Sequence, residues 1–186
     1  MISVLIVSVV LGFRQVPPVI RPSECRPFMK RSPPPAIDID DQPGHNIRRL
    51  HQISVGIFLQ ELGEMGITPV QYAALQTVAN HPGTDQRTLA RTIALDTSTT
   101  GGVIDRLEAR GCVERKTSPE DRRARQLWLT DAGQQLLRDA VPAMLRAQDQ
   151  ILGPLSERQR GEFMKLLRLL VSTNNEHSRA PSEAMR

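Results

Sequence analysis

Between residues 68 and 130 the hydrophobic spacing changes from a helical period to a strand period, and this change constrains the fold most. Apolar residues recur at three- and four-residue steps as far as Arg110, and Gly111 then ends the helical pattern. Two short segments that favour strands follow, 112–115 and 126–129, with a charged stretch between them that suits a hairpin tip. The sequence therefore predicts a mainly α fold with a small β-wing.

The helix boundaries are marked by capping residues. Thr68, Pro69 and Gln71 combine an N-cap hydroxyl, a proline at the first helical position and a capping box. Asp96 is a good N-cap for a helix that reaches Arg110. These signals predict helices over 45–66, 68–80, 85–93 and 96–110, then a long helix capped by Thr130 and kinked at Pro142, and a last helix from Ser156.

A short helix, a tight turn, a second helix and a hairpin follow one another in the order of a winged helix-turn-helix. A helix about 10 Å across fits the major groove of DNA, and a charged hairpin tip can reach the neighbouring minor groove. Hydroxyls crowd the start of the second helix, and arginines cluster on the hairpin. The candidate DNA contacts are Thr97, Ser98, Thr99, Thr100, Gly102 and Arg106 on the helix and Asp121, Arg122, Arg123 and Arg125 on the hairpin.

Each of these features also has a purely structural interpretation. Hydroxyls at a helix start commonly serve as caps, and an arginine-rich hairpin is commonly a solvated loop. Gly101 and Gly102 either permit close approach of the backbone to DNA or leave base contacts to the neighbouring hydroxyls. The order and spacing of the features together favour DNA binding.

Composition excludes several other functions. The net charge is only +4 and aromatic residues make up 3% of the chain, too few for a stacking platform for single-stranded nucleic acid. No nucleotide-binding, metal-binding or nucleophile motif is visible, so we expect neither an enzyme nor a cofactor. No apolar run approaches about 18 residues, and the two cysteines form no disulfide framework, so we expect a cytoplasmic protein without a membrane partner.

Residues 1–44 differ from the rest of the chain. An apolar run over 1–11 precedes a proline-rich stretch, and the prolines favour a disordered tail. The run lacks the positive start and the cleavage site of a signal peptide, so we favour translation beginning at Met29 over secretion. We also expect a disordered polar tail over 176–186.

Three segments resemble the MarR family of winged-helix transcriptional regulators: 95–100, 104–111 and 118–124. The resemblance extends over about 46–175. It implies a homodimer whose dimerisation region is 45–66 together with 131–175, and a DNA-binding domain over 67–130. It also implies a palindromic double-stranded operator, with Arg123 entering the minor groove and Asp121 bracing the wing.

The resemblance further implies release from DNA by a small aromatic carboxylate or phenolic ligand, as in regulators of nicotinate-type degradation. The matching ligand-binding residues are Arg48, Arg49, His51, Gln71 and Tyr72. Each of them also suits an ordinary solvated or packed position. Two alternatives remain: a winged-helix module that binds protein, and a redox-responsive regulator, for which Cys112 at the start of the hairpin is the candidate.

Overall fold

The computed structural model describes residues 36–117, 125–180 and 182. The chain divides into two units after residue 38, and the fold described below belongs to the second, residues 39–186. Within the described ranges, no helix is both long enough and apolar enough to cross a membrane. The tail predicted over 1–44 lies outside the described residues as far as residue 35.

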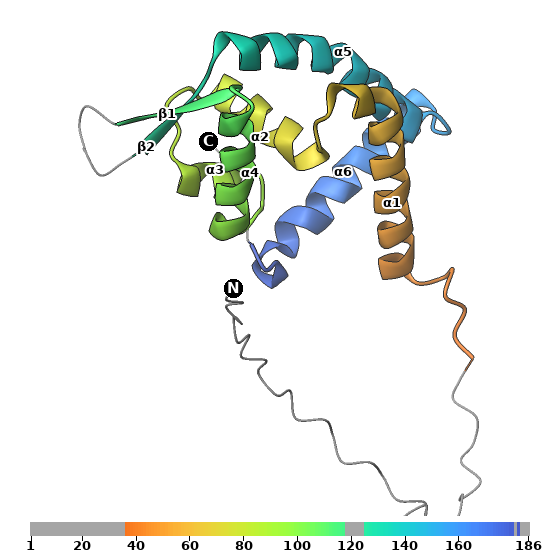
Figure 1. Ribbon diagram of the computed structural model, residues 1–186. Helices are drawn as coiled ribbons and strands as arrows, with labels where there is room; N and C mark the ends of the chain where they lie inside the picture. Colours follow the sequence, from red (N-terminus) through yellow and green to blue (C-terminus); the bar gives the residue numbers. More distant parts are fainter. Residues whose placement is uncertain (1–35, 118–124, 181, 183–186) are drawn as a thin grey trace, which may run out of the picture. The chain divides into compact units, whose positions relative to one another are not determined.

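Helices and one hairpin build the second unit (Figure 1). The hairpin pairs its strands antiparallel, with Val113 opposite Leu129 and Thr117 opposite Arg125. In chain order the elements are α1 (Pro43–Leu62), η2 (Gly63–Met65), α2 (Pro69–Asn80), α3 (Gln86–Thr92), α4 (Thr97–Ala109), β1 (Val113–Thr117), β2 (Arg125–Leu129), α5 (Asp131–Leu152), α6 (Glu157–Thr173) and η3 (Asn175–His177).

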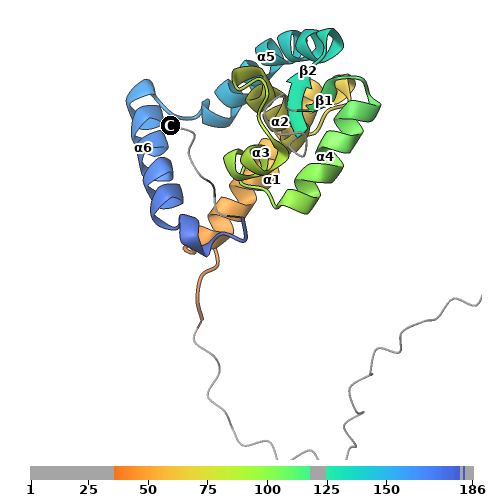
Figure 2. The ribbon, with the colours of Figure 1, turned by 90° about the vertical axis from the view of Figure 1, so that its left-hand side faces the viewer.

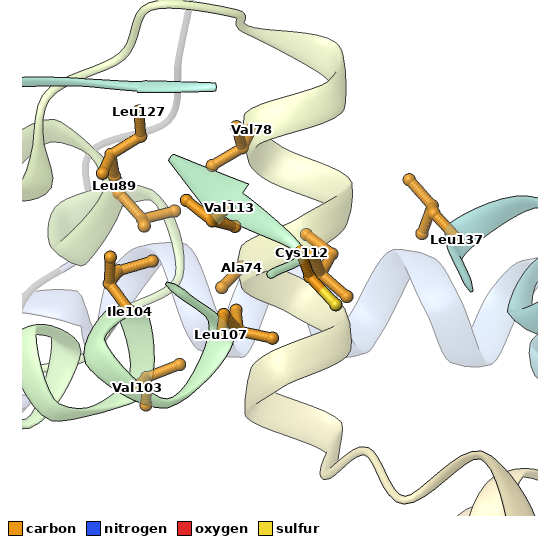
Figure 3. Close-up of a cluster of buried hydrophobic side chains, with 11 residues drawn as sticks. Ala74, Val78, Leu89, Val103, Ile104, Leu107, Cys112, Val113, Leu127 and Leu137 are labelled. Carbon is orange, nitrogen blue, oxygen red and sulfur yellow. The ribbon is translucent and has the colours of Figure 1, made fainter. Parts of the chain in front are cut away.

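One apolar core holds α2, α3, α4 and the hairpin together, and we call this assembly the winged lobe. Figure 3 shows side chains from these elements meeting, with Ala74 and Val78 from α2, Leu107 from α4 and Leu127 from β2. Helices α3 and α4 lie side by side (Figure 2). Burial of this cluster fixes α4 against the lobe by its apolar face, so its other face is left for solvent or a partner.

A second core joins α1 to α5. Phe58 and Leu62 of α1 pack against a row of alanines at 140, 143 and 147 on α5, whose small side chains let the two helices approach closely. Glu61 reinforces the contact by accepting hydrogen bonds from Arg146 (2.9 Å) and Gln150 (2.5 Å). Tyr72 and Leu136 pack against both cores, so the winged lobe is continuous with the α1–α5 pair.

The helix boundaries agree with the sequence signals. The predicted capping box of Thr68 with Gln71 is present, and a second one, of Ser156 with Gln159, begins α6. The strands are longer than predicted, and α5 continues through Pro142 without a break. The segment after α6 is not wholly irregular: it contains η3, and the Asn175 side chain makes hydrogen bonds to the backbone of Ser182.

Candidate DNA-binding surface

A tight turn joins α3 to α4. The carboxylate of Asp85 caps α3 by accepting the backbone N–H groups of Arg87 and Thr88. Burial raises the pKa of Asp85, but the hydrogen bonds from Thr88 and Arg87 outweigh that effect and the net pKa is lowered. Ala94 then turns the chain with a φ of 53°, a left-handed conformation that residues with a Cβ rarely adopt. The cap thus fixes the start of α3, and the strained turn at Ala94 sets the direction of α4 relative to it.

The first turn of α4 presents exposed hydroxyls. Asp96 caps this helix by accepting the Thr99 N–H at 2.8 Å and the Ser98 hydroxyl at 2.7 Å. Hydrogen bonds from the Thr99 side chain and backbone and from Ser98 lower the pKa of Asp96 to about 2, so it stays ionised at neutral pH. Thr97, Ser98 and Thr99 are all exposed. They form an edge of donors and acceptors of the size that a major groove admits.

Thr100 corrects one sequence prediction. It is fully buried, and its hydroxyl donates a 2.9 Å hydrogen bond to the carbonyl oxygen of Asp96. Its side chain therefore cannot reach DNA in this conformation, and the prediction that it contacts DNA is wrong. The reason is geometric: four consecutive helical residues cover a full turn, so one of them must face the core.

The two glycines of α4 have different surroundings. A Cβ on Gly101 would lie 3.0 Å from Nε2 of Gln86, whose side chain crosses from α3 to donate to the Thr97 carbonyl at 3.2 Å. Gly101 thus allows close contact between the two helices. Gly102 is open apart from the exposed Arg106 side chain, 3.7 Å from the position of a Cβ. Arg106 lies two turns beyond the hydroxyls on the same helix.

Arg115 of β1 fixes the hairpin to α4. Its guanidinium group pairs with Asp105 at 2.5 Å and also with Glu108, carboxylates that lie three residues apart on one face of α4. Arg125 lies on the paired strand, where it donates to the Thr117 hydroxyl at 2.9 Å. Asp121, Arg122 and Arg123, predicted at the wing tip, lie outside the described residues.

Comparison with known proteins shows which family this chain belongs to. The MarR family model matches residues 67–124. The transcriptional regulator HosA of Escherichia coli O111:H- is 32% identical over 128 residues, which cover 69% of this chain and 93% of HosA. The chain belongs to the MarR family.

Solved structures of MarR-type regulators share the fold. BpsR of Bordetella bronchiseptica, whose DNA binding is regulated by 6-hydroxynicotinic acid, is 29% identical with a TM-score of 0.70, covering 73% of this chain and 97% of BpsR. CouR of Rhodococcus jostii, solved on a 23-mer DNA duplex, is 27% identical with a TM-score of 0.68, covering 72% of this chain and 94% of CouR. The molecule is thus a winged-helix transcriptional regulator of the MarR family.

None of the ligand-binding residues predicted for this MarR family protein lines the cavity between α2, β2 and α5 or the pocket beside the start of α4. Gln71 is committed to the capping box, where its Oε1 accepts the Thr68 N–H at 2.9 Å. Tyr72 is half-buried and donates to Gln76, and burial raises its pKa. Arg48 pairs with Gln52 on its own helix, while Arg49 and His51 are exposed on α1.

Two positioning arginines of the MarR fold were not singled out from the sequence. The sequence prediction assigned no role to Arg115. Arg110 donates hydrogen bonds to backbone carbonyl groups more than forty residues away in the chain. Asp105 and Glu108 are spaced to lie on one face of a helix, and Arg115 follows in the next strand. This spacing is the sequence signal that could have predicted the ion pairs of Arg115. No local pattern signals a bond as distant as that of Arg110.

Proposed function

We propose that this MarR family protein is a homodimeric, sequence-specific repressor that is released from a palindromic operator by a small aromatic acid. The observation that carries the proposal is the exposed hydroxyl edge of α4, with Ser98 and Thr99, beside a hairpin fixed to the same helix by Arg115. A helix in the major groove and a wing along the backbone together read a half-site. Such a regulator works in the cytoplasm, where its DNA is.

The DNA-binding part of the proposal is tested with the protein's own upstream region at two salt concentrations and with excess non-specific DNA. We expect nanomolar binding that survives the competitor and weakens as salt rises. Binding abolished by the competitor would contradict the proposal and would favour a module that binds protein.

Two kinds of variant separate the roles of the wing and the helix. Arg123→Ala should weaken binding to all sequences and reduce the salt dependence by about one phosphate contact. Ser98→Ala and Thr99→Ala should instead relax preference at particular operator positions, each by about 1–3 kcal/mol of discrimination. If these two variants instead lost the same affinity for every DNA sequence, the hydroxyls would be assigned to phosphate contacts.

The proposed dimer rests on apolar faces left exposed on α1 and α6. Ile47 and Ile53 of α1 are 59% and 51% exposed, and none of the described side chains of α6 is buried in its own chain. Leu166, Leu169, Leu170 and Val171 of α6 are each about half exposed or more. Apolar surface of this extent on two helices fits a second copy of the chain, with residues 45–66 and 131–175 as the dimerisation region.

Solution mass measures this dimer directly. We expect a mass of two chains, and we expect Leu169→Glu with Leu170→Glu to shift it toward one chain, because buried carboxylates would have no partner. Arg168→Glu, a change of charge on the same helix, is the control. A wild-type protein of one chain's mass would contradict the dimer.

A two-fold dimer presents two copies of α4 to two half-sites. The copies should lie about 34 Å apart, one turn of B-DNA, so the operator should be palindromic. Inserting about 5 base pairs between the half-sites, half a helical turn, should abolish tight binding, while about 10 should restore part of it. Equal affinity for all three operator spacings would contradict a two-fold dimer on a palindromic operator.

The aromatic effector is proposed by analogy with BpsR, whose DNA binding is regulated by 6-hydroxynicotinic acid. An effector must bind the free protein more tightly than the DNA-bound form, since equal affinity leaves the equilibrium unchanged. We expect 6-hydroxynicotinic acid or benzoate to lower operator affinity at least tenfold. Unchanged operator affinity across a panel of aromatic acids would remove this part of the proposal.

A further inference from the structure

A pocket of about 490 Å³ lies beside the start of α4, where the end of the chain meets the winged lobe. We call the described residues 175–180 and 182 the C-terminal segment. This segment lines the pocket with Arg179 and Ala180, and the winged lobe lines it with Arg87, Ala90, Arg91, Leu95, Asp96 and Thr97. An arginine from the end of the chain thus lies beside the helix pair that the proposed function places on DNA.

Asn175 closes the C-terminal segment into a loop. Its Nδ2 donates to the carbonyl oxygen of Ser182 at 2.8 Å, and its Oδ1 accepts the Ser182 N–H at 2.9 Å. One side chain therefore satisfies both backbone groups of a residue seven positions further on. Within the loop, the Ala180 N–H donates to the Ser178 hydroxyl at 3.2 Å. Arg179 lies inside this closed loop and is itself exposed.

Arginines give the pocket its positive charge. Arg87, Arg91 and Arg179 are all exposed residues of the lining. Among the described residues, no carboxylate forms an ion pair with Arg87 or Arg179. The carboxylate in the lining, that of Asp96, already accepts two hydrogen bonds from the first turn of α4. A phosphate group is the anion that guanidinium groups on two sides of an open pocket fit best.

The pocket borders the DNA-facing edge of α4. Thr97 lines the pocket and also belongs to the exposed hydroxyls of the first turn. In a helix-turn-helix on DNA, the second helix enters the major groove and the first helix crosses the phosphate backbone. Here α4 is the second helix and α3 the first. The same docking therefore puts Arg87 of α3, and with it Arg179, beside the backbone that flanks the groove.

We propose that the C-terminal segment is a further DNA-contacting element, in which Arg179 binds a backbone phosphate group together with Arg87. The proposal rests on the proposed function, because it takes α4 as the helix in the major groove. It adds a contact from outside the winged lobe, which neither the hydroxyl edge nor the hairpin supplies. Because phosphate groups carry no sequence information, Arg179 raises affinity without changing which sequence is preferred.

The test measures binding of the full-length protein to two duplexes of equal length, its own upstream region and an unrelated sequence, over a range of salt concentrations. We expect Arg179→Gln to weaken binding to both duplexes by the same factor, roughly threefold or more. The slope of log affinity against log salt should fall by about 0.9 per chain. Arg158→Gln is the control: it removes the same charge from an exposed position on α6 outside the pocket, and should leave the slope unchanged.

Two further variants separate the charge of Arg179 from its position. Arg179→Lys keeps the charge and should retain the salt slope of wild type. Asn175→Ala opens the loop but leaves every arginine in place, and should show part of the loss seen in Arg179→Gln. A wild-type slope in Arg179→Gln would overturn the proposal. So would tighter binding in Arg179→Gln or Asn175→Ala, because the segment would then obstruct DNA rather than bind it.

The preference between the two duplexes tests the proposed function separately. If wild type binds both duplexes equally while Arg179→Gln still lowers the salt slope, the C-terminal segment contacts DNA but the protein does not read an operator. If wild type prefers its upstream region and Arg179→Gln matches wild type at every salt concentration, the proposed function stands and the C-terminal segment takes no part in DNA binding.

Discussion

The guanidinium group of Arg110, at the end of α4, donates a 2.8 Å hydrogen bond to the carbonyl oxygen of Gly66, in the turn that follows α1. A second bond, of 2.5 Å, reaches the carbonyl oxygen of Met65. Helix ends leave carbonyl groups without partners, and here a residue of α4 supplies donors to the turn after another helix. The end of α4 is therefore tied to the end of the helix that packs on α5.

Removing the two hydrogen bonds of Arg110 should weaken the contact between the end of α4 and the turn after α1. We expect Arg110→Ala to lower the free energy of unfolding by about 1–2 kcal/mol, since two backbone acceptors lose a charged donor. Arg158→Ala, which removes an exposed arginine elsewhere, should change it by less than about 0.5 kcal/mol. Urea denaturation of both variants measures the difference, and equal stabilities would mean that the bonds of Arg110 contribute nothing.

Gly133 is required by the packing of α5 on the residue before the hairpin. A Cβ at this position would lie 1.9 Å from the backbone oxygen of Cys112, which also accepts the Thr130 N–H. We expect Gly133→Ala to lower stability by about 3 kcal/mol, because backbone rather than a flexible side chain must move. Gly161→Ala on α6, where nothing lies within 4 Å, should instead raise stability slightly, and thermal unfolding compares the two.

A substitution at Ala94 should raise stability rather than lower it. Its φ of 53° costs a residue with a Cβ roughly 1 kcal/mol. We therefore expect Ala94→Gly to raise stability by up to about 1 kcal/mol, after the greater freedom of glycine in the unfolded chain is counted. Ala73→Gly in the middle of α2 should lower it by about 1 kcal/mol. A loss of stability in both variants would contradict the strain assigned to this turn.

Asp96 predicts a dependence on pH. Because the pKa of this carboxyl is lowered to about 2 in the folded protein, its stabilising effect is present above the unfolded pKa of about 4 and is lost as pH falls toward 2. Wild type should therefore unfold at a higher temperature than Asp96→Ala at neutral pH, and the gap should close between about pH 4 and 2. A gap that stays constant down to pH 2 would assign the effect to something other than the charge.

Local signals explain why so much of the winged lobe could be predicted. Thr68, Asp96 and Ser156 are each followed at the right spacing by the groups they cap, so the helix starts follow from chemistry within four residues. The hairpin follows from the change of period. Its length was underestimated because Lys116 and Arg125 are polar strand residues on an exposed edge, which hydrophobic alternation does not detect.

The site was predicted less well because it depends on the direction in which each side chain points and on contacts between residues far apart in the sequence. Thr100 shares its side-chain chemistry with Thr99, and only the helical rotation between them makes one buried and the other exposed. Gln71 cannot be wholly free for a ligand while it closes a capping box, and both roles were assigned to it from the sequence. The cavity lined by Trp128 joins residues of α2 with residues of β2 and α5, and no local pattern indicates such a meeting.

The pairing of Arg115 with Asp105 and Glu108 has a consequence for how this protein can change over evolutionary time. The contact makes the base of the hairpin and the middle of α4 one frame, while Ser98 and Thr99 lie in the first turn of α4, outside it. Under the proposed function, substitutions at Ser98 and Thr99 alter which DNA is preferred without disturbing the frame. Descendants of this chain would then acquire new target genes by single changes at 98 or 99, whereas a change at 105, 108 or 115 would need compensation.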